Sequence, residues 1–190
     1  NVLWQREYPL DPEKKLPMWG LAASPIIDRG RVIIHVGAEP DGCLIALNCR
    51  TGAEVWRSLP DPSGYATPIL IDRNGRRDIV SWTPDNIHGL VAETGQVLWS
   101  VPYDVTYGVS IATPLYRDGI VFVSGYWEGA RAVQLGEEPA QAELIWQDNT
   151  HLRGVMSSPL YRDGHVYMID KSRGLKCFEL ATGRKVWDDG

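Results

Sequence analysis

The chain has 190 residues with 19 basic and 24 acidic side chains, which gives a formal net charge of −5 and a pI near 5.4. An acidic chain lacks the basic face that nucleic-acid binding requires, and no apolar run approaches the roughly 18 residues of a membrane helix. The 19 glycines and 13 prolines indicate many turns, and 44% hydrophobic residues suffice for a core, which together favour an all-β chain.

Four similar units follow one another, each opened by two small residues and a proline. These tripeptides stand about 45 residues apart, at 23–25, 66–68, 112–114 and 157–159. Each proline leads through an apolar stretch to a turn that ends in glycine, at 28–30, 73–75, 117–119 and 162–164. Asn-Gly and Asp-Gly between apolar segments predict tight β-hairpins, because both turn positions need positive φ.

Three further strands are predicted in each unit. The second strands cover 32–36, 78–82, 120–124 and 165–169, and the third cover 43–47, 88–91, 130–135 and 175–180. The fourth strands close on Trp56, Trp99, Trp146 and Trp187. Four short antiparallel strands in about 45 residues match one blade of a β-propeller. We therefore expect repeats at 21–63, 64–106, 107–152 and 153–190. Residues 1–20 would be the end of a preceding unit, with Trp4 in its last strand and an insertion around 11–15.

The link between third and fourth strands carries the most specific motif. The first unit shows it in full, as Ala46, Asn48, Thr51, Gly52 and Trp56. The second unit keeps Thr94, Gly95 and Trp99, and the fourth keeps Thr182, Gly183 and Trp187. In the third unit only Trp146 is clear, because residues 137–141 replace the Thr-Gly turn. The pattern resembles the tryptophan-docking motif of the pyrroloquinoline-quinone (PQQ)-like propellers, in which an indole lies flat over a small residue and covers the seam between blades.

The resemblance implies an all-β propeller of the eight-bladed quinoprotein type, built from four-stranded antiparallel blades, of which about four are present. The remaining blades would come from the same longer chain, which we favour, or from a second copy. The resemblance also implies an extracytoplasmic location, periplasmic or secreted.

The family it resembles includes PQQ- and calcium-dependent alcohol dehydrogenases, a non-catalytic scaffold lipoprotein of outer-membrane protein assembly, and many bacterial repeat proteins. The dehydrogenases use calcium held by acid and amide oxygens and commonly a disulfide of adjacent cysteines. Here Cys43, Cys49 and Cys177 are not adjacent, and no loop offers a matching calcium set. No catalytic, cofactor-binding or metal-binding residue is assigned, and no cofactor is expected. The alternatives are a fragment of a PQQ- and calcium-dependent alcohol or sugar dehydrogenase and, less favoured, an extracytoplasmic sensor domain.

The expected function is a binding or scaffold module that holds a protein partner or a small ligand on one loop face. Its loops would be 57–64, 100–108 and 147–154 with 169–174, since propellers bind through loops at one rim. The candidate binding-face residues are Trp82, His88, Tyr107, Trp127, His151 and Arg153. No Ser-His-Asp or Cys-His set follows from the spacing, and no glycine loop for phosphate is present.

Overall fold

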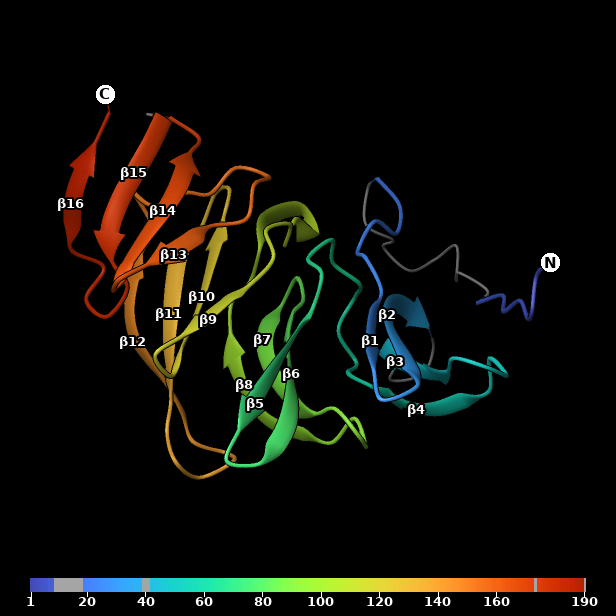
Figure 1. Ribbon diagram of the computed structural model, residues 1–190. Helices are drawn as coiled ribbons and strands as arrows, with labels where there is room; N and C mark the ends of the chain where they lie inside the picture. The colour runs from blue at the N-terminus through green and yellow to red at the C-terminus, as the bar shows by residue number, and fades with distance from the viewer. Residues whose placement is uncertain (9–18, 39–41, 173, 190) are drawn as a thin grey trace.

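The computed structural model describes residues 1–8, 19–38, 42–172 and 174–189, and these residues form four antiparallel sheets of four strands each (Figure 1). Within every sheet the strands are hydrogen-bonded in chain order. Figure 1 shows the sheets side by side, from the blue sheet near the N-terminus to the red sheet near the C-terminus. The sheets correspond to the four blades that the repeat predicts. In the described part of the chain the one helix is the 3-10 turn η1, Thr106–Gly108.

The strand bounds follow the repeat. Blade 1 contains β1 (Ile26–Asp28), β2 (Arg31–Ala38), β3 (Gly42–Asn48) and β4 (Glu54–Ser58). Blade 2 contains β5 (Ile69–Arg73), β6 (Arg76–Trp82), β7 (Asn86–Val91) and β8 (Val97–Pro102). Blade 3 contains β9 (Leu115–Arg117), β10 (Ile120–Gly125), β11 (Gly129–Leu135) and β12 (Ala142–Asp148). Blade 4 contains β13 (Leu160–Arg162), β14 (His165–Asp170), β15 (Gly174–Glu179) and β16 (Lys185–Asp188).

The first two strands of every blade are joined by a two-residue hairpin. In blade 2 these residues are Asn74 and Gly75, with φ of 48° and 78°. Asp118 and Gly119 in blade 3 have φ of 52° and 77°. Two successive positive φ values define the turn that matches the right-handed twist of the flanking strands. The Asn-Gly and Asp-Gly dipeptides therefore set where each first hairpin reverses.

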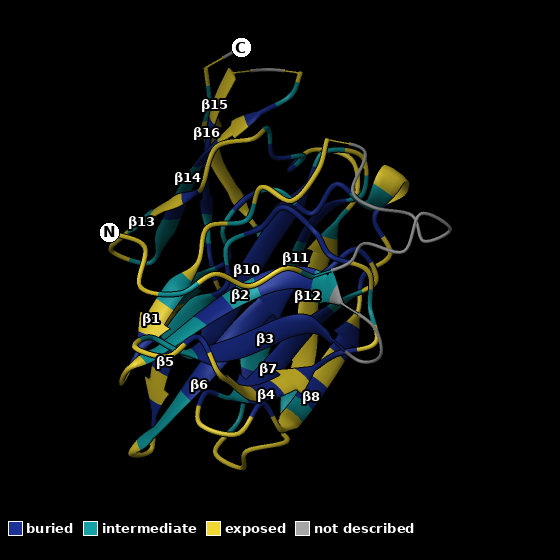
Figure 2. Ribbon diagram, turned by 90° about the vertical axis from the view of Figure 1, so that its right-hand side faces the viewer, coloured by how far each residue is buried: buried dark blue, intermediate teal, exposed yellow. Residues whose placement is uncertain are grey.

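The hydrophobic core lies between neighbouring blades, against their middle strands (Figure 2). β3, β6 and β10 are almost wholly buried, whereas the fourth strands β4, β12 and β16 are mostly exposed or half-buried. One apolar cluster joins Val80 and Trp82 of blade 2 to Val121 and Val133 of blade 3. Similar clusters join blades 1 and 2 and blades 3 and 4. Each sheet thus buries a face against the next sheet.

A tryptophan from one unit lies on the third-to-fourth-strand turn of the next blade. Trp56 Nε1 donates to the carbonyl of Ala92 at 3.2 Å, and Trp146 Nε1 donates to that of Leu180 at 2.8 Å. The indole of Trp56 covers Gly95, where an added Cβ would lie 2.6 Å from the ring. Gly95 has φ of 74°, so this turn needs glycine both for its backbone and for the close approach.

The same contact occurs at Trp4, whose Nε1 donates to the Cys49 carbonyl at 2.8 Å and whose ring covers Gly52. Residues 1–8 form no strand with the blades described here, so the assignment of Trp4 to the last strand of a preceding unit stays a prediction. The expected insertion at 11–15 lies outside the described residues.

Within each blade, the docking tryptophan stands opposite a small residue on the third strand. The cross-strand pairs are Ala46 with Trp56, Gly89 with Trp99, Ala132 with Trp146 and Cys177 with Trp187. The register shifts immediately after each of these pairs. At Gly89 an added Cβ would lie 2.1 Å from the Trp99 ring. The small residue therefore makes room for the indole.

Two of the tryptophans differ from this pattern at their outer contact. The blade after Trp99 lacks a Thr-Gly turn, and Trp99 packs in the apolar cluster with Val133 and Leu135 of blade 3. Trp187 in blade 4 is 40% exposed.

The described residues also contain no helix with the length and apolar character needed to cross a membrane.

Replacing Trp56 by alanine should lower the free energy of unfolding by about 3–5 kcal/mol, because the substitution empties a buried seam. Trp187→Ala is the matched control, since the same side chain is 40% exposed there, and should cost less than about 1 kcal/mol. Denaturant unfolding followed by circular dichroism measures both changes. Equal losses in the two variants would contradict the seam assignment.

Candidate binding face

One edge of the blades, here called the loop rim, is formed by the connections that leave each fourth strand and by the turns between second and third strands. Its described segments are 59–68, 83–85, 103–114, 126–128, 149–159 and 171–172. Because consecutive strands are antiparallel, these segments share one end of the sheets. The first hairpins and the third-to-fourth-strand turns form the opposite edge, here called the turn rim.

Asp61 fastens the first connection of the loop rim to blade 2. Its Oδ2 atom accepts hydrogen bonds from His88 Nε2 at 2.9 Å, from Asn86 Nδ2 at 2.9 Å and from Thr83 Oγ1. Burial alone would raise the pKa of Asp61, but the hydrogen bonds from His88, Asn86 and Thr83 outweigh burial and lower the pKa to about 2. The carboxylate is therefore ionised at neutral pH.

His88 extends this network to Ser100, whose Oγ lies 2.7 Å from His88 Nδ1. An ionised Asp61 can only accept, so Nε2 carries a proton, and in the neutral ring Nδ1 accepts from the Ser100 hydroxyl. The spacing in the sequence does not reveal the set, because Asp61 lies 27 residues from His88 and meets it only through loop closure. Since Asp61 also holds Asn86 and Thr83, the network anchors the connection between blades 1 and 2.

A second histidine joins the same two blades beneath the rim. His35 Nε2 lies 2.8 Å from Ser81 Oγ, and the ring is buried. Burial, together with the nearby His88, lowers the pKa of His35 to about 4. The ring is therefore neutral at physiological pH and acts as a hydrogen-bonding core residue.

Exposed aromatic side chains gather on the loop rim where η1 meets the β10–β11 turn. The rings of Tyr107 and Trp127 meet edge to face with centroids 5.4 Å apart, and Tyr126 contacts Trp127 with centroids 4.5 Å apart. Lys171 Nζ lies 4.3 Å from the centre of the Tyr126 ring, within cation–π range. Tyr107 is 66% exposed and Trp127 is 40% exposed. We call Tyr107, Tyr126, Trp127 and Lys171 the rim cluster.

Two backbone features hold the loops that carry the rim cluster in place. Glu128 Oε1 accepts a hydrogen bond from the Thr106 amide at 2.9 Å, which joins η1 to the β10–β11 turn. Tyr107 has φ of 58°, a left-handed conformation that is uncommon for an aromatic residue and is found where surroundings constrain a loop. The cluster therefore brings together side chains from three blade connections in one fixed arrangement.

Basic residues border the rim cluster on the side of blade 4. The Arg153 guanidinium donates to Ser172 Oγ at 2.6 Å, and the Arg153 amide donates to Asp170 Oδ2 at 2.8 Å. His151 is exposed, with Nδ1 3.4 Å from an oxygen of Asp148. This part of the loop rim therefore combines exposed aromatic rings with positive charge.

The structure corrects two of the six predicted binding-face residues. Trp82 has no exposed surface, because the Tyr103 ring stacks on it with centroids 5.5 Å apart. His88 is buried in the interior of β7 rather than exposed at the edge of that strand, and it forms a hydrogen bond with Asp61. Tyr107, Trp127, His151 and Arg153 all lie on the loop rim, and Tyr107 and Trp127 are in contact.

Sequence reasoning missed Tyr126, Lys171 and Asp61. Tyr126 precedes Trp127 in a turn bounded by glycines, which is a usable signal for an exposed aromatic pair. No sequence signal points to Lys171 or Asp61, because the residues that they contact are distant in the sequence. In the described part of the chain no group of three or more His, Cys, Asp or Glu side chains could hold a metal ion.

The family model of the outer membrane protein assembly factor BamB matches residues 8–189. The chain belongs to this family. BamB from Moraxella catarrhalis superposes with a TM-score of 0.64 at 18% identity, over 87% of this chain and 50% of that one. A comparison with the sequences of curated proteins finds no match.

Two quinohemoprotein alcohol dehydrogenases share the fold of this BamB-family chain. ADHIIG from Pseudomonas putida HK5 has a TM-score of 0.58 at 16% identity, over 95% of this chain and 35% of that one. The Comamonas testosteroni enzyme has a TM-score of 0.59 at 12% identity, over 89% of this chain and 34% of that one. The chain thus spans half or less of these three structures, and likeness at such identities concerns the fold alone.

The Asp61 network predicts a pH dependence of stability. The pKa of Asp61 is lower in the folded chain, about 2, than its ordinary value of 3.8, so its stabilisation is present above pH 4 and is lost as pH falls through 2. Between pH 4 and pH 2 the wild type should therefore lose about 2 kcal/mol more unfolding free energy than Asp61→Asn. Denaturant titrations of both proteins across this range measure the difference. Parallel pH profiles would contradict the assignment.

Proposed function

We propose that this chain is part of a non-catalytic binding or scaffold module that contacts a protein partner through the rim cluster. The observation that carries the proposal is the contact between Tyr107 and Trp127, which remain 66% and 40% exposed although both are large aromatic residues. Large aromatic side chains at the surface are typical of the energetic centre of protein interfaces.

The surroundings of the rim cluster support this function. Tyr and Trp supply large contact areas for little loss of conformational entropy, and here their arrangement is held before any partner arrives by the bond from Thr106 to Glu128. Lys171 and Arg153 add positive charge beside the rings. We therefore propose that the bound segment presents apolar or aromatic side chains together with acidic ones, because such a segment complements both properties.

Membership of the BamB family supports a role in protein assembly and an extracytoplasmic location for this chain, and we propose both. The name of the family describes an outer membrane protein assembly factor.

A dehydrogenase is the competing class, since two quinohemoprotein alcohol dehydrogenases share the fold. The described residues fit its calcium poorly. Asp61, a buried carboxylate of the loop rim, already accepts from three side chains, and no cluster of acidic residues in the described ranges could hold a metal ion. We therefore derive no chemical step through a quinone from these residues.

The rim cluster should be needed to retain the partner. The protein is immobilised and exposed to extract of its source cells, and bound proteins are quantified by mass spectrometry. Tyr107→Ala combined with Trp127→Ala should lower recovery of the specific partner by about tenfold or more, as loss of an interface anchor does. Trp187→Ala is the control, because Trp187 is equally exposed at 40% but lies outside the loop rim, and it should retain the partner. Unchanged recovery with the double variant would contradict the proposal.

A quinone titration separates the two classes. Tryptophan fluorescence of the full-length protein should show no saturable quenching by micromolar PQQ, with or without calcium. Saturable, calcium-dependent quenching would instead support the dehydrogenase, and the search would then turn to alcohols and sugars as substrates.

A further inference from the structure

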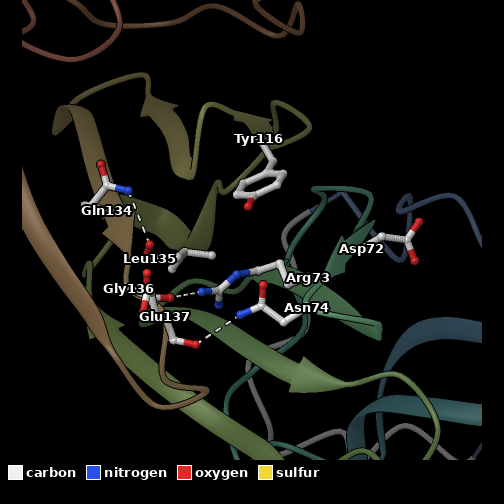
Figure 3. Close-up of a pocket in the computed structure, with 8 residues that line it drawn as sticks. All are labelled: Asp72, Arg73, Asn74, Tyr116, Gln134, Leu135, Gly136 and Glu137. Atoms are coloured by element: carbon white, nitrogen blue, oxygen red, sulfur yellow. Dashed lines mark hydrogen bonds between the residues drawn. The ribbon is translucent and has the colours of Figure 1, made fainter.

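The seam between blades 2 and 3 is closed differently from its neighbours at the turn rim. Blade 3 has no Thr-Gly turn there, and the hairpin of blade 2 takes its place. The Arg73 guanidinium donates through Nη2 to the Gly136 carbonyl, and Asn74 Nδ2 donates to the Glu137 carbonyl at 3.2 Å (Figure 3). A polar contact therefore stands where an indole covers glycine in other seams.

A cavity of about 400 Å³ opens beside this contact. Arg73 and Asn74 of blade 2 line one side, and Tyr116, Gln134 and Glu137 of blade 3 line the other (Figure 3). The volume falls within the range of roughly 300–1,000 Å³ that is typical of small-molecule sites. The longer turn of blade 3 thus leaves a cavity of ligand size at the seam.

Arg73 carries a positive charge in this wall that the described residues do not neutralise. It exposes only 9% of its surface, and its Nη1 atom is buried without a hydrogen-bond partner in the described ranges. Asp72 points away from the cavity in Figure 3 and pairs with Arg77 at 2.9 Å instead. A buried cation with neither a carboxylate nor a full set of acceptors is costly, and an anion beside it offsets that cost.

We propose that this cavity binds an organic carboxylate, with Arg73 as its counter-charge. Guanidinium and carboxylate are complementary in shape and charge. Glu137 also belongs to the lining, and its negative charge disfavours a dianion such as phosphate more than a single carboxylate. In Figure 3 the Tyr116 hydroxyl points toward Arg73 and Leu135, where it can donate to the same ligand. The carboxylate belongs either to a free acid or to the end of a peptide.

This site is independent of the proposed function, because it lies on the turn rim rather than on the loop rim. Its test uses calorimetric titration of the full chain with sodium gluconate and with N-acetylglycylglycine. Sorbitol and the amide of the same peptide are the uncharged counterparts. Saturable binding of at least one acid, without binding of its counterpart, is the expected result. The acid that binds more tightly then identifies the source of the carboxylate: gluconate stands for a free acid and N-acetylglycylglycine for the end of a peptide.

Arg73→Met should weaken this binding about tenfold or more, since it removes a charged partner. Tyr116→Phe removes one hydroxyl and should weaken it about 2–10-fold while leaving the ring in place. Tyr161→Phe is the matched control, because Tyr161 occupies the same place in the repeated Pro-Leu-Tyr-Arg-Asp-Gly segment of blade 4 and should bind as wild type.

Four outcomes would overturn the site. They are no saturable binding of either acid, equal binding of acid and uncharged counterpart, tighter binding of inorganic phosphate, and wild-type affinity in Arg73→Met. If Arg73→Met does not fold, Tyr116→Phe decides, and wild-type affinity in that variant overturns the proposal.

Discussion

The contact of an indole with a positive-φ glycine in the next unit is the constraint on which this structure depends. A four-stranded blade has two apolar faces, and neither can be buried within the blade. In the seam between blades 1 and 2 and in the seam between blades 3 and 4, the indole closes one end and also satisfies a backbone carbonyl of the neighbouring turn, as Trp56 does for Ala92. Because Gly95 leaves no room for a Cβ beneath the ring, turn geometry and packing require the same residue.

This agreement between local and long-range requirements explains why the fold could be predicted from the sequence. Hairpins such as Asn74-Gly75 need positive φ at two positions, and only a few residue types adopt it readily. The spacing of glycine and tryptophan then repeats with the blade. Strand edges were less predictable: β7 begins at Asn86, before the predicted start at residue 88, which places His88 in the interior of the strand rather than at its edge. The prediction placed the Trp82 side chain on the surface, but Tyr103, which follows β8, covers it, and no local pattern signals such coverage.

The candidate site was predictable in part for the same reason. Tyr107 and Trp127 stand out as aromatic residues in turns, so their place on one rim follows from blade topology alone. Their contact with Tyr126 and Lys171 depends on how three connections fold over one another. The buried network of Asp61 and the cavity at Arg73 arise where segments from different blades meet, and only coordinates reveal them. The docking contact recurs along the repeat and thus determines where the two rims lie. The candidate sites arise where the chain departs from that repeat.

The most direct test of the docking constraint compares two glycines with nearly equal backbone conformations. Gly95 and Gly75 have φ of 74° and 78°, but an added Cβ meets the Trp56 ring at Gly95 and meets nothing within 4 Å at Gly75. Gly95→Ala should therefore lower the unfolding free energy by about 1–3 kcal/mol more than Gly75→Ala, and this excess should vanish when both are made in a Trp56→Ala background. Equal losses at the two glycines, or an excess that persists without the indole, would contradict the account.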